Sequence, residues 1–296
     1  MRFAFILFLL PALAMASSRE EALTHLDSLR KIESPLKRLE LFSQKFVGLP
    51  YGKNGPLGEG EGARYDADPL YRFDTFDCTT FVETMVSLTL SQNVDEFELN
   101  MNKIRYANAE VGFLTRNHFT SLHWVPHNIS NGLFEEINEK VIPQSGQMIA
   151  RASIDFGGWL MKLSSSAIQG KDMTPEDKEV RLQELKDLGP FYPPVEATLY
   201  YISIDQLVKN PKLLKRIPHG SIVNLVRPNW DLTQTAGTHL NVSHQGFLFR
   251  KGKTLYLRHA SASGTVRDDV FLNYLKRFQD HPTLKGIHLL RLKSLR

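Results

Sequence analysis

The sequence contains one cysteine, Cys78, at a place where its thiol could be reactive. Phe81 and Met85 follow at helical spacing, so Cys78 falls in the first turn of an expected buried helix that Thr75 or Asp77 can cap. At a helix N-terminus the unpaired backbone N–H groups and the helix dipole favour the thiolate, which is the nucleophilic form. A cysteine packed in an ordinary core is inert. We therefore expect Cys78 to act as a nucleophile if a base lies nearby.

Two of the ten histidines could supply that base and the group that orients it. His244 and His259 each alternate with apolar residues in two expected neighbouring strands. A hairpin centred on Lys251-Gly252 would place His244 directly opposite His259, with their Cβ atoms about 5 Å apart. The residues expected on the same face as His244 are Leu240, Val242, Gly246 and Leu248. A pair of core histidines is the alternative, but a nucleophile, a base and an orienting group together favour catalysis.

Other polar clusters are weaker candidates for a site. His239 lies on the opposite face of its strand by the same alternation, and is excluded unless a bulge intervenes. His123 and His127 stand four residues apart, but Pro126 lies between them and no nearby carboxylate completes a familiar set of metal ligands. The segment 55–62 lacks the Gly-Lys-Ser/Thr of a phosphate-binding loop. The sequence therefore predicts neither a metal nor a cofactor.

The N-terminal segment predicts export. Arg2 precedes an apolar run from Phe3 to Leu13, and Ala14-Met15-Ala16 offers a small-x-small cleavage site before Ser17. The run is shorter than the roughly 20 apolar residues that span a bilayer, and no cysteine at the cleavage site could carry a lipid. We expect residues 1–16 to be a removable signal peptide and the mature protein to be periplasmic or secreted, with no membrane span.

The composition excludes several other classes of protein. A hydrophobic content of 42% and a single cysteine exclude disorder, a disulfide scaffold and a multi-pass membrane protein. The 36 Lys and Arg against 32 Asp and Glu give a net charge of +4, and loss of Arg2 with the signal peptide lowers it by one. That excess is too small to favour nucleic acid as a partner. We expect a globular protein that is a monomer.

The chain after the signal peptide is expected to form a single α+β domain with four regions. Residues 17–47 show two helical patterns broken at Ser34-Pro35, and residues 48–93 hold a glycine-rich surface loop, 48–76, followed by the cysteine helix. Residues 94–215 are expected to be a large, mainly helical insertion, and residues 216–296 the histidine-bearing antiparallel sheet. The expected strands cover 220–226, 239–249, 254–260 and 286–292, with a further strand at Ile202 and a helix at 270–278.

Several blocks of the sequence are similar to those of a known group of enzymes. They are GLPY at 48–51, GPLGEG at 55–60, FDCTTFV at 76–82, RNHF at 116–119, SHQGF at 243–247, HAS at 259–261 and GIH at 286–288. The blocks resemble the signatures of the NlpC-type, papain-like cell-wall hydrolases. Within that group they most resemble the bacterial N-acetylmuramoyl-L-alanine amidase-like family. The resemblance extends from Leu41 to about Leu292.

The resemblance implies a papain-like fold in which the catalytic helix packs on an antiparallel sheet. Matched residue by residue, Cys78 corresponds to the nucleophile, His244 to the general base and His259 to the residue that orients the base. Tyr51 corresponds to a tyrosine near the nucleophile, and the backbone N–H of Cys78 would contribute to an oxyanion hole. The chain departs from the commoner pattern by having Thr79-Thr80 in place of Ser-Gly, and by its large insertion. Both departures bear on substrate choice.

The expected substrate is peptidoglycan or a muropeptide, cleaved at an amide bond. The name of the family suggests the bond between the lactyl group and L-alanine, whereas wider relatives commonly cut the γ-D-glutamyl bond to diaminopimelate. An acyltransferase with the same three residues, or a wall-binding module without turnover, remain alternatives. Asp74 could shape the side that meets an amine-bearing substrate, and aromatic and amide side chains elsewhere suit sugar and peptide. The expected substrate-binding residues are Tyr51, Asp74, Arg116, Asn117, His118 and Trp124.

Overall fold

The computed structural model of the protein describes residues 10–52, 57–170 and 172–295. Residues 1–9 of the predicted signal peptide lie outside the described residues, and helix α1 (Leu10–Leu29) begins within the rest of that segment. In the part of the chain that is described, no helix is both long and apolar enough to cross a membrane.

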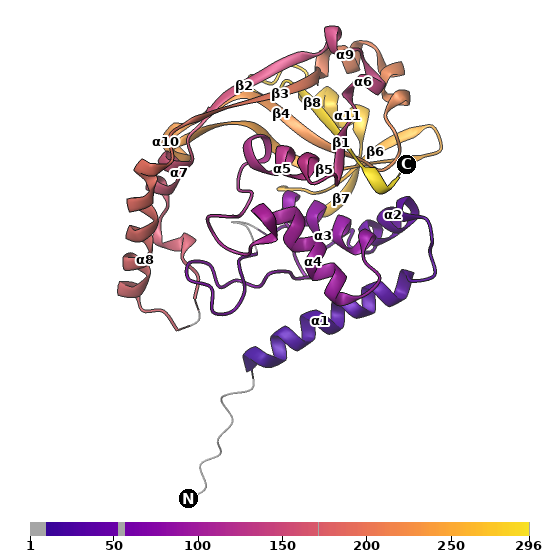
Figure 1. The fold of residues 1–296 in the computed structure, drawn as a ribbon. Helices are drawn as coiled ribbons and strands as arrows, with labels where there is room; N and C mark the ends of the chain where they lie inside the picture. Colours follow the sequence, from indigo (N-terminus) through magenta and orange to yellow (C-terminus); the bar gives the residue numbers. More distant parts are fainter. Residues whose placement is uncertain (1–9, 53–56, 171, 296) are drawn as a thin grey trace, which may run out of the picture.

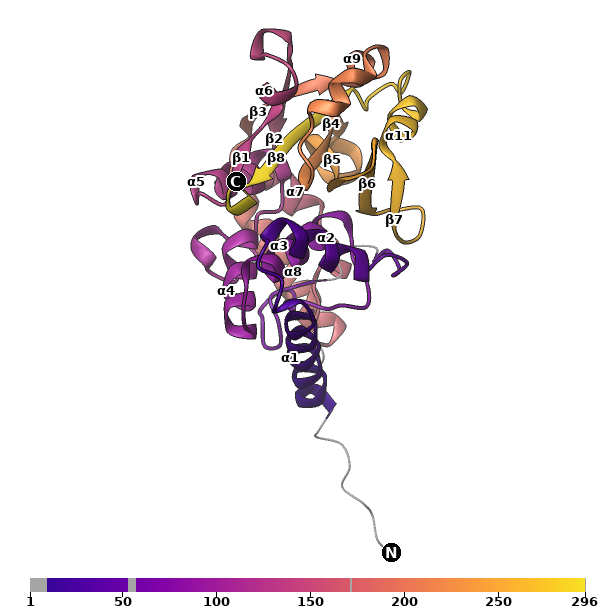
Figure 2. The same cartoon turned by 90° about the vertical axis from the view of Figure 1, so that its right-hand side faces the viewer.

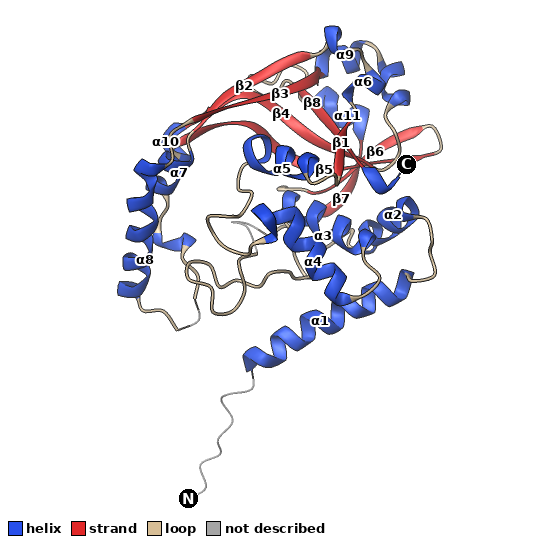
Figure 3. Cartoon of the chain, in the orientation of Figure 1, coloured by secondary structure: helices blue, strands red, loops and turns tan. Residues whose placement is uncertain are grey.

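An eight-stranded antiparallel sheet forms the centre of the fold (Figures 1 and 3). Seven strands follow the order β2-β3-β8-β4-β5-β6-β7, and β1 pairs with β8. The strands are β1 (Phe134–Glu136), β2 (Met148–Ile154), β3 (Val195–Ser203), β4 (Ser221–Leu232), β5 (Thr238–Lys251), β6 (Thr254–Ala260), β7 (Val266–Val270) and β8 (Gly286–Leu292). The α+β class and the antiparallel sheet agree with the sequence analysis.

Helices cover both faces of this sheet (Figure 2). One face packs on α2 (Pro35–Lys45), α3 (Cys78–Leu90) and α4 (Val94–Arg105), and the other on α9 (Ile204–Lys209) and α11 (Phe271–Arg277). The alternation of side chains along β5 produces the two cores, because Phe247 and Phe249 join the α3 side while Leu248 joins the α11 side. The cysteine helix is therefore packed directly on the histidine-bearing strand.

The predicted insertion contributes strands as well as helices. β2 and β3 lie within 94–215 and form one end of the sheet, so this region extends the sheet in addition to covering it. The alternation of large apolar residues that marks the later strands is weaker here, because alanines occupy buried positions: Ala150 and Ala152 in β2, and Ala197 in β3. The helices of this region and its neighbours are α5 (Val125–Ser130), α6 (Asn138–Val141), α7 (Phe156–Lys162), α8 (Pro175–Leu188) and α10 (Thr233–Ala236).

In its described residues, 48–52 and 57–76, the glycine-rich segment is irregular, as expected, but it is more than a surface loop. Phe73 and Phe76 are buried in the core beside α3, and Leu57 is also buried. Tyr51 forms an isolated bridge with Phe76, which closes the base of the segment. These contacts place Tyr51 next to the start of α3.

Candidate active site

Cys78 is the first residue of α3. Asp77 is the N-cap, and its Oδ1 accepts a hydrogen bond from the backbone N–H of Thr80 at 2.7 Å. The Thr80 hydroxyl in turn accepts from the backbone N–H of Asp77 at 3.0 Å, which completes a capping box. The predicted position of the cysteine in the first turn, and Asp77 as its cap, are confirmed.

Cys78 favours the thiol form, whereas its place at a helix N-terminus predicted the thiolate. Burial and the neighbouring Asp77 carboxylate raise the pKa of the Cys78 thiol to about 12, although hydrogen bonds from Gln245 and Thr79 act to lower it. The charge that caps the helix thus opposes the dipole that would stabilise a thiolate. The sulfur therefore carries its proton at neutral pH and would need a base to remove it.

Two histidines and an aspartate form a hydrogen-bonded chain beside Cys78. His244 Nε2 lies 2.6 Å from His259 Nδ1, and His259 Nε2 lies 3.0 Å from Asp269 Oδ2. Because the carboxylate accepts the His259 Nε2–H, His259 Nδ1 is left as an acceptor for His244 Nε2–H. This assignment leaves His244 Nδ1 without a proton. Burial and the nearby His259 lower the pKa of His244 to about 3, so its imidazole is neutral at physiological pH.

Asp269 was not foreseen from the sequence. It lies on β7, a five-residue strand that the pattern analysis did not identify, and its carboxylate is also held by Arg267 at 3.0 Å and by Arg277 at 3.6 Å. A chemical argument could have indicated such a residue, because a buried orienting histidine needs an acceptor for its second N–H. Hydrogen bonding to His259 and the Arg267 charge hold the pKa of Asp269 below its ordinary value, although burial acts against them.

The register between the two histidines differs from the expected one. β5 and β6 pair as Lys251 with Thr254 and as Phe247 with Arg258, so the turn is Gly252-Lys253 and each facing position shifts by two residues. His259 therefore stands opposite Gly246, and His244 reaches it diagonally. A Cβ at Gly246 would lie 2.9 Å from the His259 Cβ. Only glycine leaves room there for the two imidazoles to meet.

A β-bulge next to His244 changes the faces predicted for β5. His244 pairs with Leu225 and Val242 pairs with Val226, which leaves Ser243 as the extra residue. The prediction that Gly246 and Leu248 share one face with His244 holds, because the register is continuous between them, whereas the bulge interrupts the alternation before Val242 and Leu240, so it fails for those two. The bulge lets one strand place Leu240, Val242, Ser243 and His244 around Cys78.

His239 does not join the His244–His259–Asp269 chain despite this bulge. Its Nε2 lies 3.8 Å from Asp231 Oδ1 on the neighbouring strand, and the pockets beside Cys78 have other lining residues. Its side chain thus pairs locally with a surface carboxylate.

Two neighbouring pockets lie at the start of α3. The smaller, of about 100 Å³, is lined by Cys78, Thr79, His118, Phe119, Thr120, Leu240, Val242, Ser243, His244 and Gln245. The larger, of about 520 Å³, shares Thr79 and His118 with it and is called the large groove below. Besides those two residues its lining consists of Asp66, Asp77, Thr80, Glu83, Phe113, Arg116, Asn117, Trp159, Lys162, Leu163, Ser164, Ser166, Ala167, Thr235 and Ala236.

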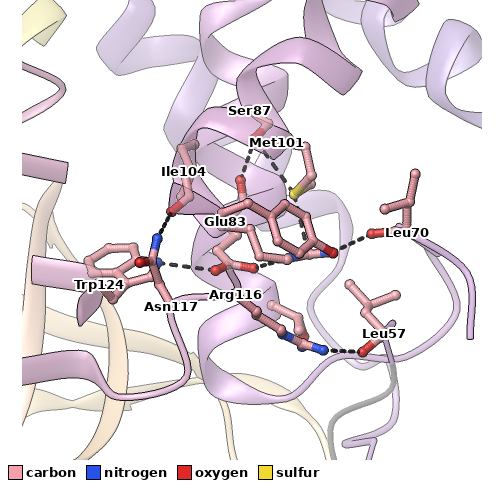
Figure 4. Close-up of polar contacts among 12 residues, drawn as sticks. Leu57, Leu70, Glu83, Ser87, Met101, Ile104, Arg116, Asn117 and Trp124 are labelled. Atoms are coloured by element: carbon pink, nitrogen blue, oxygen red, sulfur yellow. Dashed lines mark hydrogen bonds and ion pairs between the residues drawn. The ribbon is translucent and has the colours of Figure 1, made fainter. Parts of the chain in front are cut away.

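Three of the predicted substrate-binding residues line the large groove. Arg116 donates to the Leu57 carbonyl at 2.7 Å, and Asn117 donates to the Ile104 carbonyl at 3.2 Å (Figure 4). His118 lies at the junction of the two pockets, with its Nε2 2.6 Å from the Phe113 carbonyl. Burial lowers the pKa of His118 to about 3, so it stays neutral. All three side chains are fixed by contacts with backbone carbonyls.

Trp124, which was expected to line the groove, is instead a core residue. It is fully buried, stacks on Phe134 with ring centroids 5.2 Å apart, and donates its indole N–H to Glu83 at 3.1 Å (Figure 4). Glu83 also pairs with Arg105 at 2.7 Å. The tryptophan was placed wrongly because its short π-helix turns the ring inward, towards a buried carboxylate that needs a donor.

The two remaining predicted residues have different positions. Tyr51 pairs with Phe76, just before Cys78 in the chain, and lines neither of the two pockets described above. Burial and the charges of Cys78 and Asp77 raise its pKa to about 12. Asp74 points to solvent, with 66% of its side chain exposed, and pairs with Arg72 at 2.6 Å. Asp74 lines neither of the two pockets described above, so its predicted contact with substrate has no support in the geometry.

Metal chemistry has no candidate centre in residues 10–52, 57–170 and 172–295. Within them no group of three histidine, cysteine, aspartate or glutamate side chains has an arrangement that could hold a metal ion. His123 and His127 lie in consecutive short helical segments, and His127 Nε2 contacts the Lys103 carbonyl at 2.9 Å.

Comparisons with known proteins point to wall hydrolases. Residues 41–283 match the family model described as N-acetylmuramoyl-L-alanine amidase-like. A solved structure from Legionella pneumophila, of the family DUF1460, is 32% identical with a TM-score of 0.90, covering 95% of this chain and 96% of that one. No protein with a curated description matches the chain.

Two Bacteroides structures are more distant. A B. fragilis protein described as a candidate xylanase is 26% identical with a TM-score of 0.59, covering 84% of this chain and 99% of that one. An N-acetylmuramoyl-L-alanine amidase from B. uniformis is 23% identical with a TM-score of 0.62, covering 88% and 99%. The likeness to the amidase concerns the fold alone.

Proposed function

Because the chain belongs to the N-acetylmuramoyl-L-alanine amidase-like family, we propose that it is a cysteine hydrolase that cleaves an amide bond of the wall peptide in peptidoglycan. The observation that carries this proposal is that Cys78 shares a pocket with His244, whose imidazole is the first member of the His244–His259–Asp269 chain. The proposal includes a papain-like, NlpC-type fold, which the packing of the cysteine helix on the histidine-bearing strand supports.

The geometry supports a mechanism in which proton removal accompanies attack. The Cys78 sulfur bonds to the carbonyl carbon of the substrate amide while its proton passes to His244 Nδ1. We assign the backbone N–H of Cys78, in the first turn of α3, to stabilisation of the oxyanion. When the C–N bond breaks, the proton moves from His244 to the leaving amine. Water then attacks the thioester with help from His244, releasing the carboxylic acid and restoring the thiol.

His259 and Asp269 keep His244 in the productive tautomer. As His244 becomes positively charged in the first step, its Nε2–H is held by His259, and the negative charge of Asp269 lies behind that ring. The chain therefore stabilises the imidazolium as it forms, without itself giving up a proton. We further propose that the lactyl–L-alanine amide is cut, that residues 1–16 are an export signal, and that the mature enzyme is a periplasmic or secreted monomer.

The experiment that tests the proposal is mass spectrometry of fragments released from purified sacculi and defined muropeptides by the mature protein. Wild type should release free stem peptides, whereas Cys78→Ala and His244→Ala should release none and His239→Ala should retain most of the activity. Iodoacetamide at pH 9 should inactivate the enzyme and a chelator should not. Fragments ending at D-glutamate would move the cut to the γ-D-glutamyl bond. Binding without cleavage by any variant would identify a wall-binding module and refute the enzyme.

A further inference from the structure

The large groove has an aromatic wall that the proposed mechanism does not use. Phe113, His118 and Trp159 form this wall, with the ring centroid of Trp159 lying 4.6 Å from that of His118 and 5.9 Å from that of Phe113. Trp159 is only partly buried, and it lines the groove. Because His118 also lines the pocket that holds Cys78, a molecule lying along this wall would reach the reacting centre.

Trp159 is held in place by the close packing of its helix. Asp155 caps α7 and accepts from the Gly158 N–H at 2.6 Å, and Phe156 contacts the indole with ring centroids 5.5 Å apart. A Cβ at Gly157 would lie 2.2 Å from the Gly189 carbonyl oxygen, so α7 lies directly against the neighbouring backbone. The tryptophan is therefore a pre-organised surface, which lowers the entropy cost of binding a rigid ring.

The polar part of the groove is rich in acceptors and hydroxyls. Asp66, Asp77 and Asn117 supply side-chain oxygens near the aromatic wall. Ser164, Ser166 and Thr235 supply hydroxyls that can donate or accept. Aromatic rings beside such groups suit a ligand with apolar C–H faces and many hydroxyl or N–H groups, which describes an N-acetylated sugar.

Charge distinguishes this ligand from the other half of a muropeptide. A wall stem peptide carries free carboxylates, and the charged groups of the groove are largely paired within the protein. Glu83 pairs with Arg105, and Arg116 lies 3.9 Å from both Asp66 and Glu59. Lys162 lies at the exposed edge. An acidic stem would find little uncompensated positive charge in this groove, whereas an uncharged sugar needs none.

We propose that the large groove is the glycan subsite of the enzyme, and that Trp159 is the side chain on which an uncharged N-acetylated sugar of the substrate lies. This inference rests on the proposed function, because it assigns the acyl side of the scissile amide to the large groove. The leaving residue then occupies the smaller pocket, where Leu240 and Val242 leave room for a small apolar side chain such as that of alanine. Trp159 is a specificity residue, and it does not take part in proton transfer.

Paired substrates test the subsite. One is a disaccharide-bearing muropeptide and the other is the matching lactyl peptide without sugar, which has the same scissile amide. Trp159→Ala should lower kcat/KM for the sugar-bearing substrate about 10- to 100-fold, as loss of an aromatic anchor commonly does. It should change kcat/KM for the lactyl peptide less than about twofold, and Trp159→Tyr should restore part of the loss. Trp230→Ala is the matched control, because Trp230 lies on β4 and packs against Arg227 with the guanidinium 4.7 Å from the ring centroid.

A binding measurement separates this inference from the proposed function. In the Cys78→Ala background, the disaccharide without peptide should quench tryptophan fluorescence, and Trp159→Phe should abolish the quenching. Equal losses on both substrates, or quenching that survives Trp159→Phe, would overturn the glycan subsite while leaving the hydrolase intact. Sugar binding through Trp159 with no cysteine-dependent cleavage would retain the subsite and refute the hydrolase.

Discussion

At the scale of single residues, the reaction depends on where protons sit before substrate binds. The pKa of Cys78 is raised to about 12 and that of His244 is lowered to about 3, so both groups are neutral across the physiological range. The mechanism proposed above therefore uses general-base activation of a thiol, and a preformed thiolate–imidazolium pair is not needed. Burial imposes this state on both groups, because each charged form would lose solvation.

The first prediction concerns alkylation of Cys78 in the folded protein. Because the thiolate fraction grows until pH reaches the pKa, the rate with iodoacetamide should rise about tenfold per pH unit from pH 7 to 10 without a plateau, whereas an ordinary thiol levels off above its pKa of about 8.5. Asp77→Asn keeps the cap but removes the charge that raises the pKa of Cys78, so it should speed alkylation at neutral pH. Stopped-time mass spectrometry measures the rates. A plateau below pH 7 would show a resting thiolate.

The second prediction tests Asp269 as a positioning residue. Asp269→Asn replaces an acceptor with an amide that can donate to His259 Nε2, which would reverse both tautomers and put a proton on His244 Nδ1. We expect kcat to fall about 10- to 100-fold with little change in KM. Asp231→Asn is the matched control, since that carboxylate pairs with His239 on the surface. Equal activity of the two variants would remove Asp269 from the mechanism.

At the scale of elements, the meeting of β5 with β6 positions the base. Gly246 lies between the two imidazoles, and a Cβ there would come within 2.8 Å of the Arg258 carbonyl oxygen and 2.9 Å of the His259 Cβ. Arg258 cannot yield easily, because its side chain pairs with Asp268 at 2.7 Å and donates to the Glu40 carbonyl at 3.0 Å. The strand pair is therefore tightly constrained at the point where the histidines touch.

The third prediction follows from that constraint. Gly246→Ala should force β6 away, lengthen the contact between His244 and His259, and lower the free energy of unfolding by about 1–3 kcal/mol. Activity should fall at least about tenfold, since misplacement of a catalytic group by 1 Å can cost about 100-fold. Thermal unfolding and kcat/KM are the measurements. Gly252→Ala, in the turn with nothing within 4 Å but a φ of +59°, should lose some stability and keep its activity. Full activity in Gly246→Ala would contradict the argument.

Elements with strong local signals were predictable from the sequence, and those set by tertiary contacts were not. The start of α3 at Cys78 and the range of β6 follow from capping and alternation. The register of the hairpin was missed by two residues because Lys251-Gly252 and Gly252-Lys253 are equally plausible turns, but a shift of two preserves the face of each side chain. The bulge at Ser243 and the short strand that carries Asp269 leave no periodic trace, so they required the structure.

At the scale of the whole molecule, a buried charge network stabilises the helical layer behind the large groove. Glu83 on α3 pairs with Arg105 at the end of α4 and accepts from the indole of Trp124, and Arg105 also donates to the Leu70 carbonyl (Figure 4). Four segments far apart in sequence thus meet behind the large groove. This arrangement explains why Trp124 is buried while Trp159, from the sheet-extending insertion, lines the groove. The sequence alone does not separate the two tryptophans, because their roles depend on which indole N–H has a buried acceptor.

The fourth prediction is that this buried pair controls global stability. Glu83→Ala would leave the Arg105 guanidinium, 1% exposed, without its carboxylate, which should lower the free energy of unfolding by about 3–5 kcal/mol. For a chain of this size the melting temperature should then fall by about 10 °C, as each kcal/mol shifts it by roughly 2–4 °C. Glu184→Ala removes the exposed partner of Arg64 and should cost at most about 1 kcal/mol. Calorimetric scans of both variants provide the comparison. Since Glu83 also lines the large groove, a stable Glu83→Ala protein that lost only sugar binding would contradict this prediction. It would mean that the Glu83 carboxylate serves the substrate, and that the packing of α3 on α4 does not depend on it.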